Sequence, residues 1–290
     1  MQLLIYVLLY PFLWLISKLP FRLIYILSDI VYALVYNIFA YRKKVVIKNL
    51  ELAFPDKSKS EHELIAKKFY KHLCDVIFES IKSISITEKE LHKRFIIEDT
   101  SLFNELEKNN KSAILMLAHY GNWEWIFILQ TIINHKGYGV YKRLKNKYFD
   151  RLVKSIRAKY NTQLITTKET INTLNKVNDK GELSLSGFIS DQSPKKDKAF
   201  HWQKFMGIEV PVYTGAEMLA KKLDHAVVFC KISKLCRGHY SCSFQLITKQ
   251  PKTVPDYQIT DQFLELVEQQ IYEEPAYYLW THKRWKHRKQ

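Results

Sequence analysis

Two long apolar stretches open the chain, over residues 1–17 and 21–41. A membrane span needs about 20 apolar residues, so the first stretch is marginal by length. Its aromatic residues Tyr6, Tyr10 and Trp14 suit the membrane–water interface. Because neither a charged leading segment nor a small-residue cleavage site accompanies this stretch, we do not predict a removable signal peptide. The pattern predicts a membrane anchor, either a single span or a shallow helical pair, and a buried core hairpin is the alternative.

Positive residues lie on the C-terminal side of each apolar stretch. Lys18 and Arg22 follow the first, and three consecutive basic residues at 42–44 follow the second. Such charge is retained on the cytoplasmic side of a membrane. We therefore expect residues 1–41 to anchor the protein and residues 42–290 to form one domain on the cytoplasmic face.

Beyond the anchor, short apolar runs alternate with segments of helical periodicity. Strands are expected over residues 95–97, 113–117, 139–141, 163–165, 183–189, 226–232 and 240–247. Helices are expected over residues 60–83, where Ser60 and Glu63 form a capping box, and near 100–108, 123–134, 147–160, 169–179, 214–223 and 258–272. Strands separated by helices predict an α/β fold with a largely parallel central sheet covered by helices. The last two strands, adjacent in the chain, predict an antiparallel edge.

The composition and charge of the chain limit the classes of partner that we expect it to bind. The chain has 290 residues, 47% of them hydrophobic, and its 45 Lys and Arg against 29 Asp and Glu give a net charge of +16. Such a surface favours nucleic acid, anionic lipid or an acidic protein, but zinc-finger and RNA-recognition signatures are missing, so we expect no nucleic acid. The four cysteines fit a reducing compartment. The spacing around Cys236 and Cys242 matches no zinc pattern, so we predict neither a metal nor a cofactor.

The candidate chemistry lies where one apolar run stops at a histidine. The expected strand 113–117 is followed by His119, by a turn at Gly121 and Asn122, and by Glu124. Functional sites of open α/β sheets lie outside the carboxyl ends of the strands. A neutral histidine with a carboxylate on its second nitrogen is a competent base for a hydroxyl. We predict that the turn brings Glu124 to His119; a structural histidine that caps a helix is the alternative.

The segment His-Tyr-Gly-Asn-Trp-Glu resembles the acyltransferase signature of the late lipid A acyltransferase family, a branch of the wider lysophospholipid acyltransferase group. Further blocks resemble the family in the same order over most of the chain, at residues 42–55, 140–157, 190–192, 205–220 and 280–285. A lone H-x4-E is weak, whereas the ordered blocks together are specific. The resemblance implies a glycerolipid acyltransferase-like fold in the bacterial inner membrane.

The resemblance also implies site residues. In the family, the positions of Arg157 and Asp191 belong to the active site together with the His-x4-Glu pair. The planar fork of Arg157 suits a phosphate, and Asp191 could hold that arginine or an acceptor hydroxyl; a solvated helix face and a turn residue are the respective alternatives. The substrate-binding candidates from the same blocks are Asn122, Lys142, Arg143, Asn146 and Gln192. Lys142-Arg143 replaces the family's usual Arg-Pro, which keeps positive charge but loses a rigid turn.

The implied reaction is base-assisted acyl transfer. His119 takes a proton from an acceptor hydroxyl while Glu124 fixes its tautomer, and the alkoxide attacks the thioester of an acyl carrier protein or acyl-coenzyme A. No covalent acyl-enzyme is expected, since no nucleophile elbow is present in the sequence. The acceptor implied is a lipid A-type glycolipid precursor. A lysophospholipid or an aminolipid is the alternative acceptor, and a non-catalytic membrane-anchored lipid-binding protein is the alternative of another class. The basic surface suits an acidic carrier protein and anionic lipid headgroups.

Overall fold

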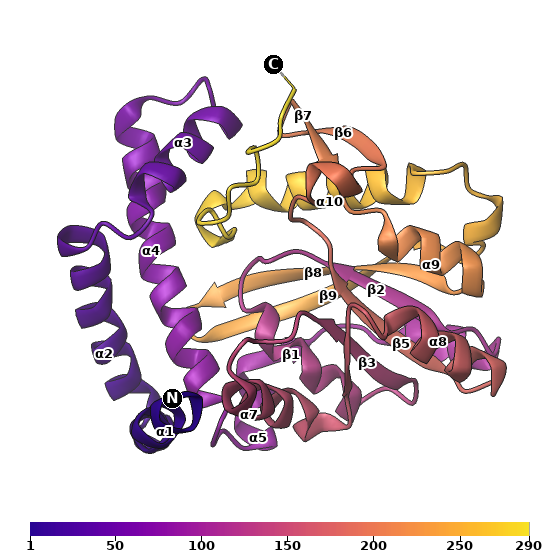
Figure 1. Cartoon of the computed structure of the whole chain (residues 1–290), viewed down its shortest axis with the longest axis horizontal. Coiled ribbons are helices and arrows are strands. Elements are labelled where there is room, and N and C mark those ends of the chain that lie inside the picture. The colour runs from indigo at the N-terminus through magenta and orange to yellow at the C-terminus, as the bar shows by residue number, and fades with distance from the viewer. Residues whose placement is uncertain (290) are drawn as a thin grey trace.

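The computed structural model describes residues 1–289. At its centre lies a seven-stranded sheet with the order β1-β9-β8-β2-β5-β3-β4 (Figure 1). Its strands are β1 (Phe95–Ile97), β2 (Ala113–Leu117), β3 (Lys136–Tyr141), β4 (Gln163–Thr166), β5 (Ser184–Ile189), β8 (Ala226–Cys236) and β9 (His239–Thr248). The five strands from β8 to β4 run parallel, β9 runs antiparallel to β8, and β1 runs parallel to β9. The predicted α/β class is confirmed, as is the antiparallel pair, although β1 rather than β9 is the outermost strand.

Helices cover both faces of the sheet, and β2 shows how the two cores are divided. Its five residues are all buried, as in a strand covered on both faces. Ile114 and Met116 pack in the core that contains α4 (Lys59–Lys82), α8 (Thr170–Asp179), α9 (Gly215–Leu223) and α10 (Gln258–Glu273). Leu115 and Leu117 pack in the opposite core with α5 (Glu88–Arg94) and α6 (Ser101–Lys108). Alternate residues of one strand thus hold both layers against the sheet.

One of the predicted helices is a 3-10 helix. The segment Trp123–Thr131, expected within a helix over 123–134, is a 3-10 helix that packs in the second core through Trp125, Ile128 and Leu129. The segment is apolar on nearly all sides, so its sequence carries no periodic pattern that distinguishes the two kinds of helix.

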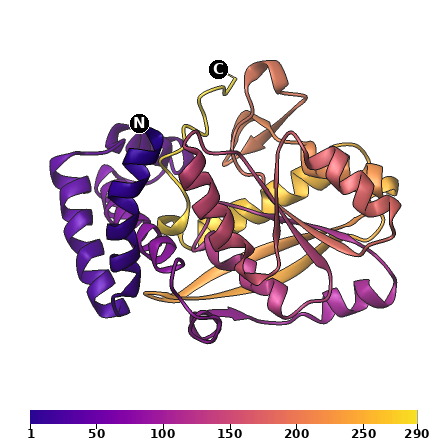
Figure 2. The same ribbon diagram turned by 60° about the horizontal axis from the view of Figure 1, so that its bottom comes forward.

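The four N-terminal helices lie together at one side of the sheet (Figures 1 and 2). They are α1 (Gln2–Lys18), α2 (Phe21–Ala33), α3 (Lys43–Ala53) and α4, and α2 runs on through a π-helical turn at Leu34–Ile38. The segment Phe21–Ile38 is long and apolar enough to cross a membrane. Large apolar side chains of α1 and α2, such as Leu4, Phe12, Ile26 and Ile30, are more than half exposed. Exposed apolar surface of this extent marks a contact with another phase or partner.

The start of α4 corrects a sequence prediction. Ser58, not Ser60, caps this helix: the Ser58 side chain accepts from Glu61 N, and Ser58 N donates to the Glu61 carboxylate. The segment contains two overlapping S-x-x-E patterns, and the helix begins at the first of them.

A two-stranded hairpin was not foreseen. β6 (His201–Phe205) pairs antiparallel with β7 (Ile208–Val212) through a two-residue turn at Met206 and Gly207, whose φ angles are +52° and +75°. Two-residue turns of this kind usually have the sequence Asn-Gly or Asp-Gly. Here the first turn residue is Met206, whose side chain is buried in the first core while its backbone adopts the left-handed conformation. The sequence therefore does not indicate a turn at this position.

Candidate active site

The register of two neighbouring strands brings His119 and Asp191 together. β2 and β5 run parallel with Leu117 opposite Ile189, and each of the two polar residues follows its strand by the same two positions. His119 Nδ1 lies 2.7 Å from Asp191 Oδ1. Asp191 is buried and His119 is partly exposed. The imidazole is therefore held from behind by a carboxylate, with its other side toward the surface.

The predicted partner of His119 is wrong. The Glu124 carboxylate accepts two hydrogen bonds from Arg157, from Nη2 at 2.7 Å and from Nε at 3.0 Å, and forms a forked ion pair with it. Asp191, expected to hold the arginine or an acceptor hydroxyl, contacts His119 instead. Glu124 lies in the first turn of the 3-10 helix beyond the glycine turn, where it meets the end of α7 (Lys147–Arg157). The four predicted catalytic residues are thus gathered at one place, but as two different pairs.

The electrostatics of the pair favour a basic histidine. Burial alone disfavours the charged ring, but the charge and hydrogen bond of Asp191, with a smaller contribution from Glu124, outweigh it and raise the pKa of His119 above its ordinary value of 6.5. Burial likewise opposes ionisation of Asp191, but the charge and hydrogen bond of His119 lower the pKa of this carboxyl. With Nδ1–H donated to an ionised Asp191, the lone pair on Nε2 is available to accept a proton.

The raised pKa predicts the pH profile. A general base at His119 would act only when neutral, so we expect kcat/KM to increase with pH through an apparent pKa above 6.5. In Asp191→Asn the charge that raises the pKa is removed while the burial remains, so this acid limb should move to lower pH as turnover falls. Initial rates over a pH series check both; an acid limb that does not move in the variant would contradict the pairing.

Two further side chains contact the imidazole. The Gln192 amide nitrogen lies 3.4 and 3.5 Å from the two ring nitrogens of His119, and the Trp123 ring meets the imidazole edge to face at 5.2 Å between centroids. Gln192, a predicted substrate-binding residue, is therefore beside His119. Lys142 and Arg143 are exposed in the segment between β3 and α7.

Two of the predicted substrate-binding residues make hydrogen bonds within the protein. Asn122 is fully buried, and its Nδ2 donates to Glu79 Oε2 at 2.7 Å. Asn146 caps α7, its side-chain oxygen accepting from the backbone nitrogens of Tyr148 and Phe149. These hydrogen bonds hold the turn after β2 and the start of α7 in place.

The C-terminal segment supports the site, a role that the sequence did not indicate. Ser193 N donates to His282 Nε2 at 3.4 Å, and burial lowers the pKa of His282 to about 4. The fully buried Arg284 donates from Nη1 to Ser193 Oγ at 2.8 Å and to Pro211 O at 3.1 Å. These bonds fix the segment that carries Asp191.

A mainly apolar pocket opens beside the two pairs. It encloses about 650 Å³ of space between atoms, with the open solvent at its mouth included. Glu124, Arg157 and Trp123 line it together with side chains of β2, β4, β5 and the 3-10 helix. Gly137, Gly139 and Gly187 line the same space and leave it open, because they carry no side chains. Among residues 1–289, no cluster of His, Cys, Asp or Glu suited to a metal ion is found.

The site thus combines a carboxylate-backed histidine at the carboxyl ends of parallel strands with an apolar pocket beside it. The family model described as bacterial lipid A biosynthesis acyltransferase matches residues 1–287, and the chain belongs to this family and is an O-acyltransferase.

Individual relatives agree with this assignment. The chain is 24% identical over 280 residues to a lipid A biosynthesis lauroyltransferase of Escherichia coli (strain K12), covering 95% of this chain and 89% of the relative. It is 21% identical over 282 residues, with the same coverage, to a lipid A biosynthesis palmitoleoyltransferase of the same organism. A lipid A biosynthesis acyltransferase of Shigella flexneri matches with the same identity and coverage as the latter.

Proposed function

We propose that this enzyme moves a fatty acyl chain from a thioester of acyl carrier protein or coenzyme A to a hydroxyl of a lipid A-type glycolipid precursor, with His119 as the general base. The observation that carries this proposal is the 2.7 Å contact between His119 Nδ1 and the buried Asp191 beside an apolar pocket. Trp123 joins the two features, because it contacts the His119 ring and lines the pocket.

The proposed reaction needs no covalent intermediate. His119 Nε2 takes the proton of the acceptor hydroxyl, Asp191 stabilises the imidazolium, and the alkoxide oxygen attacks the thioester carbonyl. The tetrahedral intermediate collapses with cleavage of the C–S bond, and the leaving thiolate receives the proton from His119. Arg157 has five N–H donors, two of which bind Glu124. We assign the others to a phosphate of the acceptor, for which the planar guanidinium is suited.

The N-terminal helices support a membrane location. We assign residues 1–41 to an anchor in the bacterial inner membrane, with residues 42–290 as an acyltransferase domain on its cytoplasmic face. Ser28 of α2 donates to the buried Asp75 of α4, and Asp29 of α2 pairs with Arg237. A helix tied to the domain by such polar contacts suits a shallow pair that lies in the interface rather than a span. Membrane flotation of the full chain tests the membrane location. Flotation after carbonate extraction, compared with flotation without it, distinguishes a span from a shallow pair.

The anchor also lies against α7, which carries basic residues on its surface. Tyr6 of α1 stacks on Tyr148 of α7 at 5.7 Å between centroids. Lys147 and Arg151 are exposed on α7. We assign this basic surface to the acidic carrier protein and to anionic lipid headgroups near the membrane.

The direct test is a transfer assay with a lipid read-out. Purified enzyme, an acyl carrier protein or coenzyme A thioester and a lipid A precursor should give a product heavier by one acyl group in the mass spectrum. A strain lacking the enzyme should accumulate a lipid A species lighter by one acyl chain. If only a lysophospholipid or an aminolipid gains the acyl group, the acceptor is wrong; if no acceptor does, the proposed function is wrong.

The pocket makes a prediction about chain length. A Cβ at Gly187 would meet only the Tyr138 carbonyl, at 3.9 Å, so Gly187→Leu should fold while its side chain fills the pocket. The four carbons of the leucine side chain displace roughly three or four methylenes of a bound acyl chain. Each methylene that is no longer buried weakens acyl-chain binding by about 0.8 kcal/mol. Competition between donors of different length should show the preferred chain become shorter, whereas Gly215→Leu, at an open position on α9, should leave the preference unchanged. An unchanged preference in Gly187→Leu would place the acyl chain elsewhere.

A further inference from the structure

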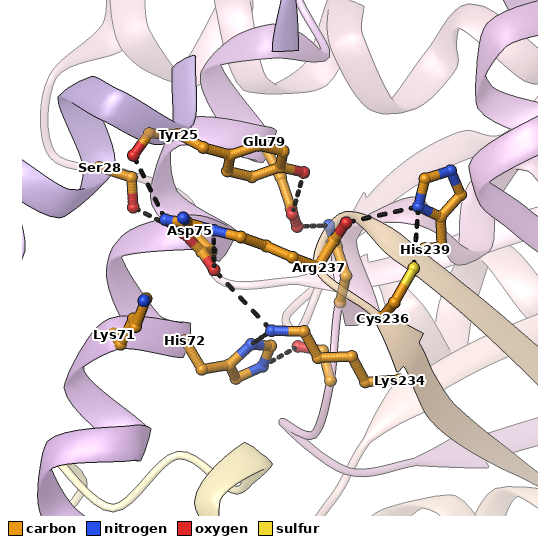
Figure 3. Close-up of polar contacts among 12 residues, drawn as sticks. Tyr25, Ser28, Lys71, His72, Asp75, Glu79, Lys234, Cys236, Arg237 and His239 are labelled. Atoms are coloured by element: carbon orange, nitrogen blue, oxygen red, sulfur yellow. Dashed lines mark hydrogen bonds and ion pairs between the residues drawn. The ribbon is translucent and has the colours of Figure 1, made fainter. Parts of the chain in front are cut away.

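One face of α4 carries buried polar side chains toward the sheet. His72, Asp75 and Glu79 recur at helical spacing and are at most 4% exposed. They meet Lys234 and Arg237 from the β8–β9 hairpin (Figure 3). Buried charges are costly unless they are paired, so a network of this kind needs a reason beyond packing.

The first connection from this network to the site runs through Glu79. Its carboxylate accepts from Asn122 Nδ2 at 2.7 Å, from Tyr240 Oη at 2.9 Å and from Tyr25 Oη at 2.9 Å. Burial raises the pKa of Glu79, while the tyrosine hydrogen bonds oppose that rise. Of the three donors, Asn122 belongs to the segment between His119 and Glu124 and transmits the position of α4 to it.

The second connection runs through His72. Burial, with the charge of Lys234, keeps the pKa of His72 well below its ordinary value, so the ring is neutral and carries one N–H. His72 Nε2 lies 3.3 Å from Gly121 O, and His72 Nδ1 lies 3.1 Å from Lys234 Nζ. Because a carbonyl only accepts and an ammonium only donates, the proton is assigned to Nε2. His72 thus donates to the backbone of the turn, and Lys234 fixes the tautomer that does so.

The turn held by these bonds is tight. Gly121 has a φ of +58°, and a Cβ there would lie 2.8 Å from Ile232 Cγ2. On its other side the backbone is tied to the C-terminal segment, since Gly121 N donates to Tyr277 O at 3.0 Å and Leu279 N donates to His119 O at 3.1 Å. The network on α4 is therefore the second of two supports for this turn.

Side chains of α2 supply further polar partners for this network. Arg237 donates to both oxygens of Asp75 and to both oxygens of Asp29, with Nη2 at 2.7 Å from an oxygen of each. Ser28 Oγ donates to Asp75 Oδ1 at 2.7 Å. Figure 3 shows Asp75 between Ser28, Arg237 and Lys234. Every charge in the network has an opposite charge or several hydrogen bonds, which fixes α4 relative to the hairpin.

We propose that His72 and Glu79 are positioning residues for acyl transfer, which hold Gly121 O and Asn122 Nδ2 and thereby fix the turn that aligns His119 with Asp191 and Glu124 with Arg157. This inference rests on the proposed function of His119. The two side chains do not touch the substrate; they act through the geometry of the turn.

The test compares two histidines of the same helix. His62 is also buried, and its Nε2 lies 2.9 Å from Phe54 O, so it makes the same kind of bond without touching the turn. We expect His72→Leu to lower kcat about 10- to 100-fold, as a displacement near 1 Å does, with little change in KM for the thioester. His62→Leu should lose a comparable amount of thermal stability and keep kcat within about twofold. His72→Gln, whose amide can donate to Gly121 O, should recover most of the kcat.

A second pair tests Glu79 without altering it. Asn122→Ala and Tyr240→Phe each remove one donor to the same carboxylate oxygen, but only the first releases the turn. We expect Asn122→Ala to lower kcat and Tyr240→Phe to leave it near the wild-type value. If His72→Leu does not fold, the comparison of Asn122→Ala with Tyr240→Phe still tests the positioning role.

The outcomes separate the two proposals. Wild-type kcat in both His72→Leu and Asn122→Ala, or equal losses in each variant and its control, would overturn the positioning role while leaving the function intact. A wild-type enzyme that transfers no acyl group to any acceptor would overturn both.

Discussion

Replacing His119 with alanine is expected to lower acyl-transfer turnover about 10²- to 10⁴-fold, the usual contribution of a general base. The variant should fold, because the imidazole is partly exposed and lies beyond the end of β2 rather than within either core. The loss should appear in kcat and kcat/KM alike, since proton transfer occurs only in the transition state. Single-turnover kinetics with a radiolabelled acyl thioester measures it.

A matched control is present in the same chain. His201 Nε2 lies 2.8 Å from Asp261 Oδ1, so it forms a similar His–Asp pair on β6 and α10 rather than beyond β2 and β5. His201→Ala should keep turnover near the wild-type value. If purified, folded His119→Ala protein turns over like the wild type, the base is another group and the proposed mechanism is wrong.

Loss of the Arg157 guanidinium is the second large effect that we expect. Arg157→Ala should lower turnover roughly 10²-fold or more, because it removes a fixed cation at the site and leaves the Glu124 carboxylate without its forked partner. Arg157→Lys should recover only part of the loss, since an ammonium cannot reproduce the planar two-donor contact. Steady-state kinetics on phosphorylated and dephosphorylated acceptors measures the effect.

The comparison of acceptors decides what Arg157 recognises. If it binds an acceptor phosphate, Arg157→Ala should lose much less on the dephosphorylated acceptor than on the phosphorylated one. Equal losses on both would assign the pair a structural or donor-binding role instead. Glu124→Gln keeps the shape of the carboxylate but weakens the ion pair, so a similar pattern in this variant would show that the two residues act as one unit.

Much of the fold follows from local pattern. All seven strands of the sheet were predicted within a few residues, because a short apolar run between helical segments is a strong signal. The hairpin β6–β7 was missed because its turn begins with Met206, whose positive φ is an unusual choice for a side chain. The placement of His119 and Asp191 just beyond strand ends was also visible in the sequence.

The sequence by itself determined which polar residues reach the carboxyl edge of the sheet, but only the tertiary structure decided how they pair. Glu124 is near His119 in the chain, and that proximity predicted the wrong partner. Asp191 is the partner because β2 and β5 are neighbours with Leu117 opposite Ile189, and strand order within a sheet is set by long-range packing rather than by chain order. The sequence does not indicate the support from His72 and Glu79 for the same reason. These side chains meet the turn only once α4 has packed against it in the folded protein.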